Sequence, residues 1–341
     1  MRLGVWTPLP HTIRREPRMA NAIAELQTRE VGPEGDAAFL FASDVIRRAD
    51  SLGFDTTLVA ARHLGPDPDA WILATALAVQ TKRIEIMVAV HPGIFHPQLV
   101  AKMGATLDRV SGGRFAMNVV NGWWPEEFNT YGNGSWLAEA DRRYRRMNEF
   151  VQVVKGLWTE EEFSFVGEFY RLDKASLPTK SITRPNPPMY TATRAEPGLD
   201  VVAEYCDYWF VPQVGDFRAF DDLCARVLKA MAEMNARSAR FGRRIKFAID
   251  AHVICESKQE DAEAIAEQVA ENGKKSQLEA VPSFGLGACL VGTPELIIER
   301  LHRLREIGVD CTMLHFHPML EGLDRFAEQI LPSLEWRSAK G

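Results

Sequence analysis

Histidine is the residue type whose placement in this sequence first suggests chemistry. Five of the eight histidines stand near the end of a short apolar run or just after it, and these are His63, His91, His252, His315 and His317. Imidazole gains or loses a proton near neutral pH, and its neutral form is a common metal ligand. One such histidine more often has a structural role, but five in equivalent positions indicate a common site.

Aromatic, cationic and amide side chains stand at the ends of the other apolar runs. They include Trp6, Arg62, Asn118, Trp123, Trp124, Thr193 and Arg194. Aromatic faces bind flat organic molecules, and cations favour anionic ones. These positions therefore predict a pocket for a flat, anionic organic ligand.

Other kinds of site are less well supported by the spacing of reactive residues. The best metal candidate is the pair His315 and His317, on the same side of one run, but no carboxylate or His-x-x-x-His pair joins it at ligand spacing. The sequence also contains neither the Gly-x-Ser-x-Gly motif of hydrolases nor the Gly-x-Gly-x-x-Gly turn of nicotinamide-binding folds. No metal is expected, and this histidine pair stays open as the alternative.

These side chains can meet only if the runs that carry them share one sheet. Strands are expected at residues 3–8, 55–60, 85–90, 115–120, 189–193, 208–211, 246–254 and 311–316. Helices are expected at residues 37–52, 70–81, 97–110, 137–157, 195–205, 217–239, 259–271, 294–306 and 320–334, the last broken at Pro332. Such alternation predicts a parallel sheet, and eight strands fit one (β/α)8 TIM barrel over residues 1–341 better than an open sheet. The carboxyl ends of the strands then face one mouth.

Three segments interrupt the alternation and are expected as insertions. Residues 11–36 form a long loop, residues 163–172 a small β-excursion, and residues 272–292 an irregular segment. Long insertions of this kind are often functional. We expect 11–36 and 272–292 to act as lids that exclude water from the site.

The composition argues against several classes of partner. A formal net charge of −6 disfavours nucleic acid and anionic membrane surfaces. The sequence contains neither a signal-peptide pattern nor an apolar stretch long enough for a membrane span. The five cysteines are scattered, without a Cys-x-x-Cys pair, so neither a disulfide framework nor a zinc site is indicated. A cytoplasmic globular protein is expected.

Four segments carry a resemblance to a known family. They are Ala105 to Trp123 around Ser111-Gly112-Gly113-Arg114-Phe115, Arg142-Arg143-Tyr144 with Gly156-Leu157-Trp158, Phe163 to Tyr170, and Leu290-Val291-Gly292-Thr293-Pro294 with Gly308-Val309-Asp310. Together they resemble the bacterial luciferase-like flavin monooxygenases, and within these the two-component group of dimethylsulfone, alkanesulfonate and pyrimidine oxygenases. The run Asp141 to Arg146 is most similar to the dimethylsulfone enzymes.

The resemblance implies a (β/α)8 barrel that binds reduced FMN, delivered by a separate NAD(P)H-dependent FMN reductase, and uses O2 to oxidise a small molecule. The flavin contacts carried over from the family are Ala61, Arg62, Asn118, Glu127, Arg143 and Tyr144. The side-chain chemistry agrees, because the Asn118 amide can hydrogen-bond the polar edge of a flavin and Arg143 and Tyr144 can hold a phosphate. Where the family has Gly-Gly-Ser-Ser, this chain has Thr193, Arg194 and Ala195, which would have to take over phosphate binding through side chains or backbone amides.

The resemblance also assigns the catalytic and substrate positions. His252 is the expected proton donor or acceptor, His317 stands at an active-site position, and Trp6, His91 and Trp123 are expected pocket walls. Asp250 replaces an arginine of the alkanesulfonate enzymes. Because a buried carboxylate repels a sulfonate, a neutral sulfone such as dimethylsulfone is favoured, with cleavage of a C–S bond.

Two other activities stay open from the sequence. One is flavin-dependent oxygenation of a heterocycle or other substrate without sulfur, and the other is a flavin- or deazaflavin-binding barrel without oxygenase activity. The family usually forms dimers or tetramers, so a homo-oligomer is expected.

Overall fold

Eight parallel strands close into a barrel. The computed structural model describes residues 1–341 except 12–23, 25–27, 29, 213–214, 275–284 and 339–341. The barrel strands are β1 (Arg2–Trp6), β2 (Thr56–Val59), β3 (Glu85–Val90), β4 (Phe115–Val119), β7 (Met189–Ala192), β8 (Tyr208–Phe210), β9 (Lys246–Cys255) and β11 (Cys311–Phe316). They pair in this order, and β11 pairs with β1 to complete the ring. The predicted (β/α)8 barrel is confirmed.

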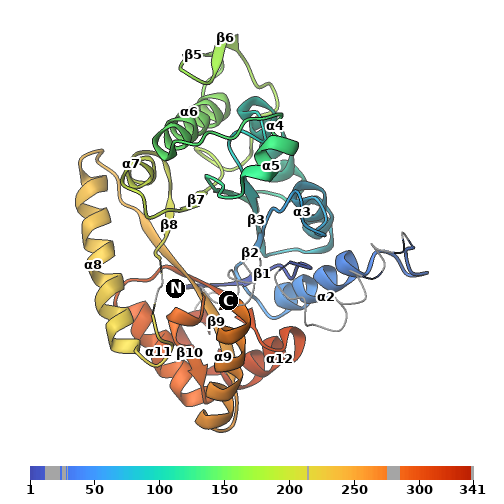
Figure 1. Ribbon diagram of the computed structural model, residues 1–341, viewed down its shortest axis with the longest axis vertical. Helices are drawn as coiled ribbons and strands as arrows, with labels where there is room; N and C mark the ends of the chain where they lie inside the picture. Colours follow the sequence, from blue (N-terminus) through green and yellow to red (C-terminus); the bar gives the residue numbers. More distant parts are fainter. Residues whose placement is uncertain (12–23, 25–27, 29, 213–214, 275–284, 339–341) are drawn as a thin grey trace.

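Helices connect the strands and lie around them (Figure 1). They are α2 (Ala37–Ser51), α3 (Ala70–Gln80), α4 (Pro97–Val110), α6 (Ala140–Thr159), α7 (Glu196–Tyr205), α8 (Phe220–Ala239), α9 (Gln259–Lys274), α11 (Pro294–Glu306) and α12 (Met319–Gln329). Asp69 and Thr293 accept backbone N–H groups at the starts of α3 and α11, as expected of N-caps. The last predicted helix is broken where Pro332 lies, in the short turn η2 (Leu331–Ser333), and the chain continues into α13 (Glu335–Ser338).

The β-excursion is an antiparallel hairpin of β5 (Phe163–Val166) and β6 (Arg171–Ala175), as predicted. Its turn is held by Glu149 of α6, whose carboxylate accepts the backbone N–H groups of Glu168, Phe169 and Tyr170 at 2.7, 2.8 and 3.1 Å. In Figure 1 the hairpin projects beyond α6.

Strand alternation decides which side chains enter the barrel. Phe115 points outward, because its ring packs against Trp71 of α3 and Trp158 of α6. Asn118, three positions later, therefore points into the barrel. At the amino end of the barrel, Arg2 pairs with Glu85 at 3.1 Å and donates a 2.8 Å hydrogen bond to the Tyr190 hydroxyl. These three side chains occupy the interior of the barrel at that end.

Three short elements differ from the prediction. Helix α5 (Pro125–Thr130) lies in the loop after β4, and the segment 272–292, expected to be irregular, contains the turn η1 (Gly285–Ala288) and strand β10 (Leu290–Gly292). β10 pairs in parallel with the last residues of β9. The expectation was wrong here because three residues carry no readable periodicity. Most of the two predicted lids lies outside the described residues.

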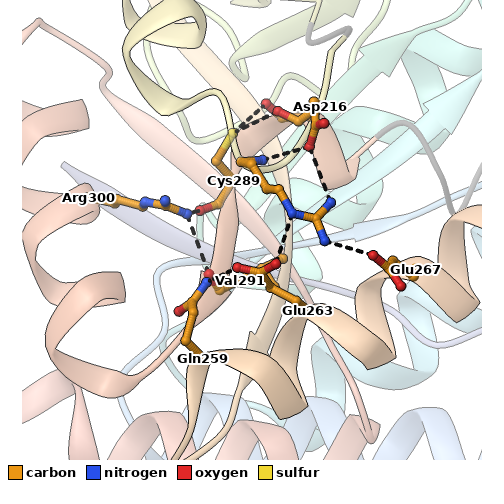
Figure 2. A network of polar contacts seen from close by, with 9 residues as sticks. Asp216, Gln259, Glu263, Glu267, Cys289, Val291 and Arg300 are labelled. Atoms are coloured by element: carbon orange, nitrogen blue, oxygen red, sulfur yellow. Dashed lines mark hydrogen bonds and ion pairs between the residues drawn. The ribbon is translucent and has the colours of Figure 1, made fainter.

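A polar network holds η1 and β10 against their neighbours (Figure 2). Arg300 of α11 is buried and donates to the carbonyl oxygens of Cys289 and Val291. Arg218, which lies just before α8, forms ion pairs with Glu263 and Glu267 of α9 at 2.8 and 2.7 Å. The network joins the start of α8 to α9 and α11 through one short strand.

Candidate active site

A column of stacked aromatic rings stands at the carboxyl ends of three neighbouring strands. Trp6 of β1 stacks on His315 of β11 with ring centroids 4.6 Å apart. His315 stacks on His252 of β9 at 4.9 Å, and His252 stacks on His317 at 4.8 Å. The parallel register places His315 beside His252. The two predicted catalytic residues and one predicted pocket wall therefore lie in one contiguous group.

A hydrogen bond forms at each end of this column. His252 Nδ1 and His317 Nε2 lie 2.5 Å apart. Trp6 Nε1 donates to Asp250 Oδ1 at 3.3 Å. Burial lowers the pKa of His317 to about 4 and holds the pKa of His315 well below its usual value, with the His317 charge adding to the effect. Burial raises the pKa of Asp250 to about 7, although the Trp6 hydrogen bond opposes the shift.

A second group lies across the mouth, on the loops after β2 and β3. His63 Nε2 and His91 Nδ1 are 3.3 Å apart. His91 is 3% exposed and packs edge-on against Phe128 of α5, and burial lowers its pKa to about 3. The predicted role of His91 as a pocket wall stays a prediction, but its side chain lies beneath α5 with little exposed surface.

Glu127 organises the loop after β2. Its Oε1 accepts the backbone N–H groups of His63 and Leu64 at 2.8 and 3.4 Å, and its Oε2 lies 4.0 Å from Arg62 Nη1. The carboxylate is buried, so the side chain that the family resemblance assigns to flavin contact holds Arg62 and its loop in place. The Arg62 guanidinium in turn lies 4.5 Å from the ring centroid of Trp123, which is 47% exposed. Ala61, beside Arg62, is buried.

Two features of β4 and β7 mark the space inside the mouth. Asn118 is 5% exposed, and its Oδ1 has no hydrogen-bond partner among the described residues. Ala192 lies on the same face of β7 as the inward-facing Tyr190 and is nevertheless exposed. A buried acceptor without a donor and a small exposed residue inside the barrel indicate room for a ligand with an N–H group.

The starts of α6 and α7 meet beside this space. Thr193 Oγ1 donates to the Tyr144 hydroxyl at 3.0 Å and accepts the Ala195 N–H at 3.2 Å. A Cβ at Gly198 would lie 2.4 Å from Thr193 Oγ1 and 2.6 Å from the Tyr144 ring, so glycine allows this close approach. Arg194 is exposed. Hydroxyls, an exposed cation and the amino end of α7 together suit a phosphate.

The arginine side chains at the start of α6 make two kinds of structural contact. Arg142 and Arg145 pair with Glu168 of the hairpin at 2.9 and 3.2 Å. Arg143 donates to the carbonyl oxygens of Leu137 and Ala138 at 2.6 and 2.9 Å. Arg143 therefore holds the loop before α6, and its predicted phosphate contact stays a prediction.

The contacts of His315 and Asp250 within the site were not predicted from the sequence, although His315 was expected at a strand end and Asp250 was used to favour a neutral substrate. The ring of His315 lies between Trp6 and His252, and Asp250 is bonded to Trp6. Their spacing from His317 and His252, two residues in each strand, places them on the same faces. That period-two signal was available for both.

Other kinds of site receive little support. Within the described ranges, no group of three His, Cys, Asp or Glu side chains is arranged to hold a metal ion. Of the helices that the structure describes, none is long and apolar enough to cross a membrane. A pocket of about 610 Å³ lies at the amino end of the barrel, opposite the mouth, between Met1, Arg244, Lys246, Arg305 and Asp310 among others.

Comparison with known proteins agrees with this geometry. The chain is 32% identical to an FMNH2-dependent dimethylsulfone monooxygenase of Pseudomonas putida, over 76% of this chain and 77% of that protein. It is 28% identical to the enzyme of the same name from Pseudomonas fluorescens strain Pf0-1, over 86% of each. The EDTA monooxygenase of Chelativorans sp. BNC1 has the same fold, with a TM-score of 0.74 and 18% identity over 100% of this chain and 95% of that one.

A family model also matches the chain directly. The luciferase-like monooxygenase model covers residues 20–311, which include the rings of Trp123, His252 and the Asn118 amide described above. The predicted family and the predicted enzyme class, an oxidoreductase of the monooxygenase type, are confirmed. The chain belongs to the luciferase-like monooxygenase family.

Proposed function

We propose that this protein is an FMNH2-dependent monooxygenase that oxidises dimethylsulfone, or a similarly small neutral sulfone, and cleaves its C–S bond. The names of the two Pseudomonas relatives support the cofactor and the substrate. The observation within the structure that carries the proposal is the buried acceptor Asn118 Oδ1, which has no hydrogen-bond partner among the residues that the structure describes. A flavin presents ring N–H groups that such an acceptor requires.

The residues around the mouth fit reduced FMN. Asn118 would accept from the isoalloxazine, and Arg62, stacked on Trp123, would compensate the negative charge of the reduced ring. Tyr144, Thr193 and the backbone at Ala195 would hold the phosphate. When bound, reduced FMN supplies the electrons with which one oxygen atom of O2 enters the substrate and the other leaves as water.

The histidines of the column would donate and accept protons beside the reacting atoms. His317 is neutral at neutral pH because burial lowers its pKa to about 4. In its hydrogen bond to His252 one ring nitrogen donates and the other accepts, so the tautomer of each ring is coupled to that of the other. The pair can therefore take a proton from the substrate carbon or from water, with Trp6 and His315 as the fixed wall beside it.

Turnover of a neutral sulfone tests the proposal. Purified protein is supplied with FMN, NADH, a flavin reductase and dimethylsulfone, and the products methanesulfinate and formaldehyde are measured. Balanced formation of both, dependent on O2 and reductase, is expected. No product from any sulfone despite tight binding of reduced FMN would contradict the substrate assignment, and no binding of reduced FMN would contradict the cofactor assignment.

We also propose that the protein self-associates and receives its reduced flavin from a separate reductase in the cytoplasm. Helix α3 contains no charged residue, yet Ile72 and Val79 on it are 73% and 66% exposed. A helix face this apolar fits a second copy of the same chain, because two such faces do not repel each other. The variant Ile72→Asp/Val79→Asp is expected to have a lower mass in light scattering than the wild type. Leu228→Asp on α8, where Leu228 is 44% exposed, is the matched control. An unchanged mass of the α3 variant would contradict this surface.

A further inference from the structure

The pocket at the amino end of the barrel has no part in the proposed chemistry. Its volume is about 610 Å³, which is within the range of sites for small organic molecules. The residues that line it come from the second half of α8, from the start of β9 and the loop before it, and from the end of α11 with the turn into β11. Since the pocket lies opposite the mouth, a molecule bound there does not compete with flavin for space.

The most deeply buried part of the pocket wall is apolar. Ile245, Phe247 and Val309 line the pocket and are all buried. Gly308, beside Val309, has a φ of 101°, and a Cβ at this position would lie 3.1 Å from Cε of Met231 on α8. Glycine therefore permits the turn and leaves the space next to the Met231 thioether open. A wall of this kind binds the apolar part of a ligand.

Three cationic side chains line the same pocket. They are Arg244, Lys246 and Arg305, and all three residues are exposed. Their neighbours Arg243 and Arg303 form ion pairs, whereas within the part of the chain that the structure describes none of these three does. The pocket therefore presents positive charge that no described carboxylate neutralises by direct contact.

Aromatic rings position two of these charges. Lys246 Nζ lies 5.1 Å from the ring centroid of Tyr208, and Arg305 Cζ lies 5.0 Å from that of Trp336. The Trp336 ring is itself held, because its Nε1 donates to the carbonyl oxygen of Met1 at 3.1 Å. A cation over an aromatic face at these distances is attracted to it. The two charges thus have defined places at the edge of the pocket.

Asp310 is the one carboxylate among the described residues that line the pocket. Its Oδ2 accepts the backbone N–H of Phe247 at 2.9 Å, so this side chain joins the turn before β11 to the start of β9. Three cations against one carboxylate make the pocket locally positive, although the chain has a formal net charge of −6. A positive hollow on an acidic protein attracts anions.

We propose that this pocket binds a small organic anion in which an apolar body carries a carboxylate, sulfonate or phosphate group. The body would lie on the buried apolar wall and the anionic group among the three cations. Because α8, β9 and α11 all contribute to the pocket, such a ligand bridges three elements and stabilises the folded protein. The inference goes beyond the proposed function and does not depend on it.

Matched probes separate the contribution of the charge from that of the apolar body. Naphthalene-2-sulfonate and naphthalene-2-sulfonamide share one ring system, and only the first is anionic at neutral pH. Methanesulfonate is the anion without the ring system.

Two variants alter the pocket and one serves as the control. Lys246→Gln/Arg305→Gln removes two charges, and Asn235→Trp, at an exposed lining position on α8, places a large side chain in the space. Lys102→Gln/Lys229→Gln removes two charges from exposed positions on α4 and α8 that do not line the pocket.

Binding to the full-length protein is measured by calorimetry at neutral pH with excess FMN. The wild type and the lysine control are expected to bind naphthalene-2-sulfonate about tenfold more tightly than either other probe. Lys246→Gln/Arg305→Gln should lose about tenfold in affinity for this anion and keep its affinity for the sulfonamide. Asn235→Trp should weaken binding of both naphthalene probes. Equal binding of the three probes by the wild type, no binding of any, or unchanged affinity in either pocket variant overturns the inference.

Discussion

His252 Nδ1 and His317 Nε2 lie 2.5 Å apart, on rings stacked at 4.8 Å and 24°. At this distance one nitrogen must carry hydrogen and the other must accept it, so the tautomer of each ring is fixed by its neighbour. The two side chains come from β9 and β11, which pair along their length. The barrel therefore presents the two imidazoles as one unit.

Removing His252 tests whether this unit transfers protons. His252→Ala is expected to lower kcat for sulfone oxidation by about 10² to 10⁴, the usual contribution of a general acid or base. His302→Ala on α11 is the control, because His302 bonds the carbonyl of Ser333 and packs edge-on against the Trp336 ring. Unchanged turnover by His252→Ala would show that the assigned role is wrong.

The buried histidines make stability depend on acid pH. Burial lowers the pKa of His91 to about 3 and that of His317 to about 4, whereas both titrate near 6.5 in the unfolded chain. Between about pH 6.5 and pH 4 the unfolded state thus binds more protons, and stability falls as pH falls, by up to about 1.4 kcal/mol per pH unit for each histidine.

Urea unfolding between pH 7 and pH 4.5 measures this slope. His317→Gln is expected to reduce the slope by up to about one proton. A slope identical in the wild type and His317→Gln would mean that His317 is protonated in the folded protein.

Asn118 is expected to bind the flavin through Oδ1, which has no hydrogen-bond partner among the described residues. Asn118→Ala should weaken the affinity for reduced FMN by about tenfold, the contribution of one hydrogen bond to a buried partner. Anaerobic titration followed by fluorescence gives the dissociation constant. Asn235→Ala, an exposed position on α8, is the control. Equal affinities of Asn118→Ala and wild type would place the flavin elsewhere.

The pair Tyr144 and Thr193 is expected to recognise the phosphate specifically. Tyr144→Phe and Thr193→Val should each reduce the preference for FMN over riboflavin, because riboflavin lacks the phosphate and the rest of the ligand is unchanged. The measurement is the ratio of the two dissociation constants. A similar loss of affinity for both ligands would instead indicate a general distortion of the mouth.

The two arginines of the network around β10 should differ in their importance. Arg300 is 9% exposed and bonds two backbone carbonyls, so Arg300→Met should lower the free energy of unfolding by about 2 to 3 kcal/mol. Arg218 has a side chain that is 42% exposed, so Arg218→Ala should cost at most about 1 kcal/mol despite its three ion pairs. Urea unfolding compares the two variants, and a larger loss for Arg218→Ala would contradict this ranking.

The elements with long, regular patterns were predictable from the sequence. β3, α4 and β11 begin and end at the predicted residues, because each carries a full apolar period between clear stop signals. α5 and β10 were not predicted, since six and three residues are too few to show a period. The alternation of strands and helices was enough to give the barrel.

The site was predictable in location but not in contacts. Strand ends gave Trp6, His252 and His317, but the stacking of Trp6 on His315 depends on the pairing of the first strand with the last. Sequence order alone does not contain that register. The case of Glu127 shows the same limit: the family resemblance assigns it to the flavin, whereas its carboxylate is bonded to backbone N–H groups of the loop after β2.

The Arg2–Glu85–Tyr190 group occupies the interior of the barrel at its amino end. Its position determines through which end of the barrel ligands enter and leave. Because the interior is occupied there, flavin, oxygen, sulfone and products all pass through the carboxyl end of the barrel. A cofactor with a large ring system that enters second would have to pass a substrate already inside. An ordered sequence follows, in which reduced flavin arrives before the sulfone and the small products depart before the oxidised flavin. Product-inhibition patterns at steady state would reveal this order.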